Sequence, residues 1–169
     1  GASPSKIEKV HLLVNPFAGK KRGRAVAAQV VELVERAGIE INVSYSAYSG
    51  HLVTMASALV VGDHDIIAVV GGDGSLSEAI TGRMLLNGKR TETFAIVPAG
   101  TGNSQAHDLR LGTPEEAVEA MLNGRRQALD LARVELTEGL PGSTGEVIVR
   151  YSHNLVTWGL GVDSTIQAE

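Results

Sequence analysis

The apolar run at residues 65–70 (DIIAVV) limits the possible folds of this chain more than any other feature. Five of its six residues are apolar, whereas a strand with one face in water alternates polar and apolar side chains. A strand that is apolar throughout is covered on both faces, which is typical of parallel sheets packed between helices. Helix-like segments stand on both sides of it, at residues 51–61 and 75–86. We therefore expect a buried central strand in an α/β sheet.

Three more segments extend this alternation of strand and helix. Residues 9–14, 41–46 and 93–97 have strand patterns, and the apolar residues of 26–37 fall on one helical face, with Gly38 placed to end that helix. Alternating strands and helices predict a doubly wound, Rossmann-like sheet in a three-layer sandwich. Such sheets bind ligands at the carboxyl ends of their strands.

The last third of the chain has a different pattern. Thr113, Pro114 and Glu116 form a helix-start signal, and Gly124 is placed to end that helix. Residues 127–136 and 146–158 then resemble two strands separated by a turn-rich stretch, which predicts an antiparallel pair. We assign residues 1–8 to a tag remnant or a flexible N-terminus, and residues 9–169 to one domain.

Composition excludes several classes of function. The net charge of −4 gives no support to nucleic-acid binding, and the absence of cysteine removes disulfides and thiolate sites. No apolar run reaches the roughly 20 residues that span a bilayer, so we expect no transmembrane segment and a cytoplasmic protein. The histidines are scattered along the chain, which argues against a histidine metal site.

Three glycine-containing turns each follow a predicted strand: residues 15–23 (NPFAGKKRG), 71–75 (GGDGS) and 98–104 (PAGTGNS). Each exposes backbone N–H groups and leads toward a helix, an arrangement that binds phosphate. Neither the Walker A pattern nor the G-x-G-x-x-G dinucleotide fingerprint is present. A single turn of this kind is a simple tight connection about as often as it is a phosphate site. Three of them in one short chain favour a nucleotide site.

The second turn places Asp73 between Gly72 and Gly74. An aspartate is common in ordinary turns, and Ser75 with Glu78 forms an S-x-x-E pattern that predicts a capping box at the start of the next helix. A carboxylate beside bound phosphates repels them unless it holds a cation or accepts a proton. Both tasks belong to phosphoryl transfer, so Asp73 favours a transferase over a passive phosphate binder.

The segment VVGGDGSLSEAI resembles the G-G-D-G-[TS]-x-x-E signature of the diacylglycerol kinase catalytic domain superfamily, which includes sphingosine and ceramide kinases. NPFAGK resembles the N-P-x-x-G-[KR] segment of that family, and PAGTGN resembles its P-x-G-[TS]-x-N segment. The resemblance implies a fold of the NAD kinase and diacylglycerol kinase type. It also implies an ATP- and Mg²⁺-dependent lipid kinase, whose substrate is a sphingoid base, ceramide or diacylglycerol presented at a membrane surface, with peripheral membrane association.

The resemblance also implies roles for individual residues. Asp73 would be the catalytic base or an organiser of the metal–phosphate site, and Asp163, in a segment similar to sphingosine kinases, would hold the lipid head group. The nucleotide site would be lined by Asn15, Pro16, Ser46, Gly71, Gly72, Gly74, Ser75, Glu78, Gly100, Thr101, Gly102 and Asn103.

One departure from the family concerns length. Family members carry a β-rich second domain after this one, and we expect that domain to be absent here, so that the chain is a truncated catalytic domain. Whether the chain is active alone stays open, as do the lipid and the oligomeric state. The alternatives are an NAD kinase-like enzyme and a nucleotide-binding regulatory module without catalysis.

Overall fold

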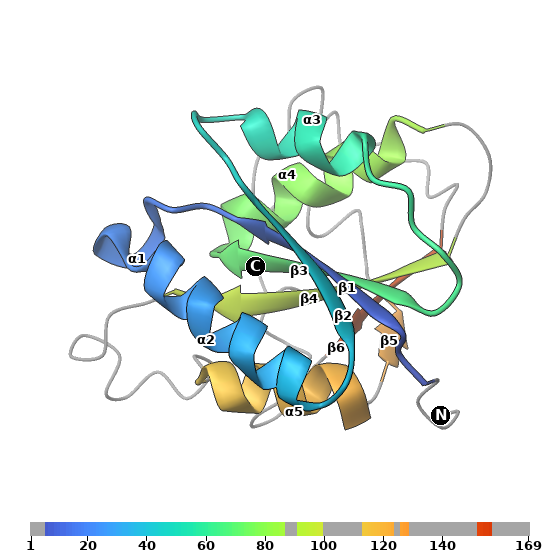
Figure 1. Cartoon of the computed structure of the whole chain (residues 1–169). Coiled ribbons are helices and arrows are strands. Elements are labelled where there is room, and N and C mark those ends of the chain that lie inside the picture. Colours follow the sequence, from blue (N-terminus) through green and yellow to red (C-terminus); the bar gives the residue numbers. More distant parts are fainter. Residues whose placement is uncertain (1–5, 87–90, 100–112, 124–125, 129–151, 157–169) are drawn as a thin grey trace.

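The structure is a computed structural model that describes residues 6–86, 91–99, 113–123, 126–128 and 152–156. These residues form one sheet with the strand order β2-β1-β3-β4-β6-β5 and helices on both of its faces (Figure 1). The strands are β1 Lys9–Val14, β2 Glu40–Tyr45, β3 Asp65–Gly71, β4 Thr91–Pro98, β5 Arg126–Ala128 and β6 Ser152–Val156. The helices are α1 Ala18–Lys21, α2 Gly23–Arg36, α3 His51–Ser57, α4 Asp73–Met84 and α5 Pro114–Asn123.

The central strand β3 packs against both helical layers, as its continuous apolar run predicts. Ile66, Ala68 and Val70 belong to the core beneath α2 and α5, while Ile67 and Val69 belong to the core beneath α3 and α4. All five are fully buried. The pairs from β2 to β6 across the sheet are parallel, and β5 pairs antiparallel with β6. The predicted three-layer α/β fold is therefore confirmed, and so is the antiparallel pairing where the predicted strands fall within the described residues.

The direction of the chain across the sheet reverses between β1 and β3. From β1 the chain passes through α2 to β2 on one side, and then returns through α3 to β3 on the other side. The helices that follow β1 and β3 lie on opposite faces of the sheet (Figure 1). In open α/β sheets ligands bind at this kind of switch point, outside the carboxyl ends of the strands.

Helix α3 is shorter than the sequence pattern predicts, since it ends at Ser57 rather than near residue 61. Arg83 of α4 donates from Nη1 to the carbonyl oxygens of Ala56 (2.7 Å) and Leu59 (2.9 Å), so it satisfies carbonyls at the end of α3. Leu59 and Val61 still pack against the α3/α4 core after the helix has ended. The apolar pattern of residues 51–61 extends beyond the helix because the segment after α3 also covers the core.

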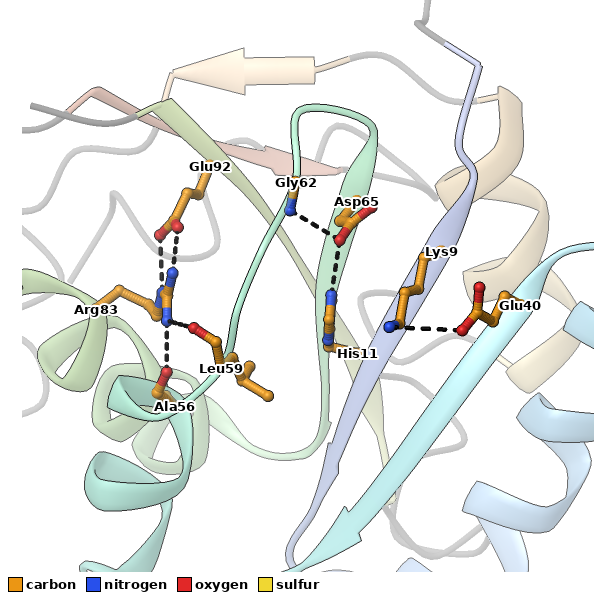
Figure 2. Close-up of polar contacts among 9 residues, drawn as sticks. All are labelled: Lys9, His11, Glu40, Ala56, Leu59, Gly62, Asp65, Arg83 and Glu92. Atoms are coloured by element: carbon orange, nitrogen blue, oxygen red, sulfur yellow. Dashed lines mark hydrogen bonds and ion pairs between the residues drawn. The ribbon is translucent and has the colours of Figure 1, made fainter.

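Two polar clusters lie near the amino ends of β3 and β4, away from the carboxyl edge of the sheet (Figure 2). Arg83 donates to Glu92 from Nε (3.0 Å) and Nη2 (2.6 Å), and both residues are buried. His11 Nε2 lies 2.8 Å from Asp65 Oδ2, which also accepts a hydrogen bond from the Gly62 amide.

The Asp65 carboxyl has a lowered pKa although it is partly buried. Burial by itself raises its pKa. The hydrogen bond from the Gly62 amide, the hydrogen bond and charge of His11, and the charge of Lys9 outweigh that effect, so the pKa of Asp65 lies below 3.8. The carboxylate form is thus the one that this cluster stabilises.

The start of α5 confirms the predicted capping box, because Thr113 and Glu116 exchange backbone-to-side-chain hydrogen bonds of 3.0 and 3.1 Å. Gly38 follows Ala37, the C-cap residue of α2, and adopts a positive φ of 80°, as a helix-ending glycine does. Within the described ranges no helix has the length and apolar character needed to cross a membrane.

Candidate active site

The three glycine-containing turns begin side by side at the carboxyl edge of the sheet. Asn15 follows β1, whose last residue Val14 pairs with Val70 of β3, and Gly71 pairs with Pro98 of β4. The Asn15 amide also donates to the Val70 carbonyl at 3.0 Å. The sheet therefore brings the starts of all three turns together, as the strand pattern predicts.

Asn15 connects the first turn to the second. Its Oδ1 accepts a hydrogen bond from the Phe17 amide (3.0 Å), and its Nδ2 donates to Ser75 Oγ (3.3 Å). The first bond forms an Asx-turn, which fixes the path of the chain after β1. The second bond joins that turn to helix α4. Both side chains thus have a structural task beside their proposed place in a nucleotide site.

Two glycines allow these turns to approach closely. A Cβ at Gly71 would lie 2.5 Å from Ser75 Oγ and 2.7 Å from Ser75 Cβ, and a Cβ at Gly23 would overlap the Asn15 carbonyl oxygen. Gly72 is different, because a Cβ there meets no atom of the described chain within 4 Å. Its φ of −115° is open to any residue. The described chain therefore leaves the position of a Gly72 Cβ unfilled.

Helix α4 begins at Asp73, with Gly72 as its N-cap and no side-chain cap. The predicted Ser75–Glu78 capping box is wrong. Ser75 is the third residue of the helix, and it is buried against Gly71 and Asn15 instead of preceding the first turn. Glu78 lies half-buried in the second turn. Gly74 is exposed in the first turn, where amide groups have no intrahelical partner.

Asp73 is half-buried at the first position of α4. A carboxylate there is stabilised by the positive end of the helix dipole, so the aspartate has a local structural role that the sequence pattern did not reveal. Its charge also offsets the attraction of the helix end for phosphate, and a cation or a proton would remove that repulsion. The geometry is therefore compatible with metal binding or with proton transfer at Asp73.

Ser46 lies at the carboxyl end of β2, beside the first turn. It is buried, and its amide donates to the Val14 carbonyl at 2.8 Å. The following loop is held by His51, whose Nδ1 accepts a hydrogen bond from the Ala47 amide at 2.9 Å. The His51 ring stacks on Tyr48 with ring centres 4.4 Å apart. This loop adds residues to the edge that pattern reasoning missed, because nothing in one sequence marks a stacked tyrosine.

The remaining predicted residues lie in two groups. Pro16 is half-buried directly after Asn15. Gly100, Thr101, Gly102, Asn103 and Asp163 fall outside the described residues, so their assignment stays a prediction. Among the residues that the structure does describe, no group of three or more histidine, aspartate or glutamate side chains could hold a metal ion.

Comparison with known proteins identifies the family of the chain. The family model for the diacylglycerol kinase catalytic domain matches residues 9–134. Sphingosine kinase 1 of Arabidopsis thaliana is 30% identical over 99% of this chain and 34% of its own length. A diacylglycerol kinase of Bacillus subtilis (strain 168) is 27% identical over 76% of this chain and 42% of its own length.

A solved structure, described as a putative diacylglycerol kinase from Bacillus anthracis str. Sterne, superposes with a TM-score of 0.56 and 26% identity. That match covers 74% of this chain and 45% of the other. The chain thus spans less than half the length of these relatives. The residues matched by the family model include β1 to β4 and the first two turns of the site, and the chain belongs to the diacylglycerol kinase catalytic domain family.

Proposed function

We propose that this chain is the nucleotide-binding part of a lipid kinase, which transfers the γ-phosphate of ATP to a lipid hydroxyl. The observation that carries the proposal is the position of Asp73, at the first residue of α4 and next to Gly72, where a Cβ would meet no atom of the described residues. A phosphate chain beside Gly72 would contact backbone amides and one carboxylate together. Relatives named sphingosine kinase and diacylglycerol kinase support a lipid as the acceptor.

In the proposed reaction the lipid hydroxyl oxygen attacks the γ-phosphorus, and the bond from that phosphorus to the bridging oxygen breaks. The electron pair of the broken bond leaves with ADP. Asp73 would accept the hydroxyl proton, or it would orient the phosphates through a cation. The Asn15–Ser75 bond keeps the two phosphate-facing turns in register, which matters because phosphoryl transfer depends on positioning.

Mg²⁺ fits the donor set as part of the nucleotide complex. This ion takes one or two carboxylates and fills its other positions with phosphate oxygens and water. Asp73 would supply the carboxylate, and the ion would neutralise phosphate charge beside it. We also propose that Gly100, Thr101, Gly102 and Asn103 line the nucleotide site, with Asp163 at the lipid head group.

The experiment that tests this function follows radiolabelled γ-phosphate from ATP into sphingoid bases, ceramides, diacylglycerols and, in a separate reaction, NAD, with the longest form of the protein that can be purified. Asp73→Asn should reduce transfer at least a hundredfold, because the loss of a proton acceptor alone removes a factor of roughly 10² to 10⁴. Asp63→Asn, at an exposed loop position, is the matched control and should leave transfer unchanged.

Two results would count against the proposal. If wild-type protein labels none of these lipids but labels NAD, the NAD kinase-like alternative is correct. If the Asp73→Asn variant transfers phosphate as well as wild type, then Asp73 serves only as the first residue of its helix.

A further inference from the structure

The loop between β2 and α3 begins with Ser46, which the family resemblance assigns to the nucleotide site. Ser46 is buried, and its amide donates to the Val14 carbonyl at 2.8 Å. The next four residues, 47–50, are all exposed. A segment whose side chains stay in water gains little from packing against the core. The path of this loop therefore depends on its hydrogen bonds.

Two hydrogen bonds join the loop to the start of α3. The His51 amide donates to the Tyr48 carbonyl at 3.1 Å, and Gly50 has φ 89° and ψ −10°, which are the angles of the third residue in a type II turn. The Ala47 amide donates to Nδ1 of the His51 ring at 2.9 Å. This second bond connects the first residue of α3 to the residue directly after Ser46.

The bond from Ala47 requires one protonation state of the His51 ring. A backbone N–H only donates, so Nδ1 must present a lone pair and the ring proton must lie on Nε2. A protonated ring carries a hydrogen on both nitrogens and cannot accept this bond. The stack of the ring on Tyr48, with ring centres 4.4 Å apart, does not use the lone pair. The bond from Ala47 is therefore the contact that protonation of His51 removes.

Charged residues of both signs lie on the segments around His51. Helix α3 packs against α4 and β1, and neither α3 nor the loop before it contains a further charged residue. Lys9 and His11 of β1 and Arg83 of α4 are each paired with a carboxylate near the amino edge of the sheet. The other charged residues of these segments and of the turn after β1 are Asp73, Glu78, Lys20, Lys21, Arg22 and Arg24. The carboxylates favour a protonated ring and the cations favour a neutral one, so the bond from Ala47 is the contact that separates the two states.

We propose that His51 is a positioning residue of the nucleotide site, which holds Ser46 in place only while its ring is neutral. This role rests on the proposed kinase function. With a neutral ring the loop is held on both sides of the Ser46 side chain, by the bond to Val14 and by the bond from Ala47. Protonation removes the second bond, and residues 47–50 bury no side chain that would replace it. Because a histidine ordinarily changes charge between about pH 5 and 8, the affinity for nucleotide should fall as pH falls through this range.

The test is calorimetric titration of the 169-residue protein with ATP at about pH 5.5 and at about pH 8. Asparagine at position 51 places Oδ1 where Nδ1 lies, and Oδ1 accepts from the Ala47 amide without titrating. His51→Asn should therefore bind ATP like wild type at the higher pH and roughly three- to tenfold more tightly than wild type at the lower pH, which is the value of one hydrogen bond. His51→Phe keeps a ring to stack on Tyr48 but has no acceptor, so it should bind roughly three- to tenfold more weakly than wild type at the higher pH. Comparing proteins at the same pH cancels the titration of ATP itself.

NMR spectra of isotope-labelled wild type examine the loop without nucleotide. We expect the ring signals of His51 to show the proton on Nε2 at the higher pH, and the protection of the Ala47 amide from solvent exchange to fall at the lower pH. His64→Asn, at an exposed position before β3, is the matched control and should keep the pH dependence of wild type. Thermal melting verifies that each variant folds, and the NMR measurement on wild type keeps the test decisive if His51→Phe does not.

Three outcomes overturn the role of His51: a proton on Nδ1 at the higher pH, the same pH dependence of ATP affinity in wild type and His51→Asn, and wild-type affinity of His51→Phe at the higher pH. Failure of the proposed function gives a different result. If wild type binds no ATP at either pH, the nucleotide site is refuted, and the NMR spectra still decide whether a neutral His51 holds the loop.

Discussion

Replacing Gly71 and Gly72 by alanine, one at a time, distinguishes the packing of the site from its ligand space. At Gly71 the new methyl group would lie 2.7 Å from Ser75 Cβ. That atom is fixed to the helix backbone and cannot rotate away, so α4 itself must shift. Overpacking of this kind costs about 1–3 kcal/mol, which corresponds to a melting temperature lower by about 2–12 °C for a domain of this size.

At Gly72 the methyl group meets no atom of the described chain within 4 Å, and the backbone is extended. Alanine restricts the unfolded chain, which adds about 0.4–1 kcal/mol of stability. It is also a poorer N-cap than glycine, which removes a similar amount. The two effects nearly cancel, so we expect the free energy of unfolding to stay within about 0.5 kcal/mol of wild type.

Two assays distinguish the Gly71→Ala and Gly72→Ala variants. Urea denaturation should show a loss of stability for Gly71→Ala and almost none for Gly72→Ala. Calorimetric titration with ATP should show weaker binding by Gly72→Ala, because its methyl group occupies the proposed phosphate space. Equal stability of the two variants would refute the close Gly71–Ser75 packing, and wild-type ATP affinity in Gly72→Ala would refute the phosphate position.

Three further predictions concern the scaffold. Arg83→Ala should lower the free energy of unfolding by about 3–5 kcal/mol in urea, because it leaves Glu92 buried without its guanidinium. The pKa of Asp65 is lower in the folded protein than in the unfolded chain, where it is about 3.8. The ionised carboxylate therefore stabilises the fold above the unfolded-state pKa, and this stabilisation is lost as pH falls through the folded-state pKa. Between neutral pH and strong acid, the free energy of unfolding should fall more for wild type than for Asp65→Asn. Lys21 has a left-handed φ of 69°, a conformation that costs a residue with a side chain about 1–2 kcal/mol. Thermal melting should therefore show Lys21→Gly to be at least as stable as wild type. The control Ala28→Gly, on the exposed face of α2, should lower the free energy of unfolding by about 1 kcal/mol.

The sheet could be predicted from periodicity because burial on both faces leaves a clear mark on the sequence. The apolar run at 65–70 has no polar residue to place in water after Asp65, and it became a strand between two cores. Because strands and helices alternate along the chain, the residues that follow parallel strands lie at one edge of the sheet. The order of the chain therefore predicts that Asn15, Gly71 and Pro98 lie at the carboxyl edge. The placement of these turns therefore required no knowledge of side-chain contacts.

The buried Arg83–Glu92 pair could not be predicted in the same way. An arginine and a glutamate in a polar stretch usually lie on the surface, since charged residues are seldom fully buried. Arg83 is buried only because its guanidinium also finds the carbonyl oxygens of Ala56 and Leu59, more than twenty residues away. Those carbonyls are free to accept because α3 ends at Ser57. Neither half of this arrangement is visible in the local sequence.

Two similar sequence patterns that form different structures show what determines where the helix of the candidate site begins. Thr113-Pro-Glu-Glu116 and Ser75-Leu-Ser-Glu78 both match the capping-box sequence. Only the first forms the box, because the helix there begins directly after Thr113. At the second, Gly71 lets Ser75 pack against the strand end, and Asn15 donates to its hydroxyl. The helix therefore begins two residues before Ser75, and this tertiary contact places Asp73 at the helix end, directly after Gly72.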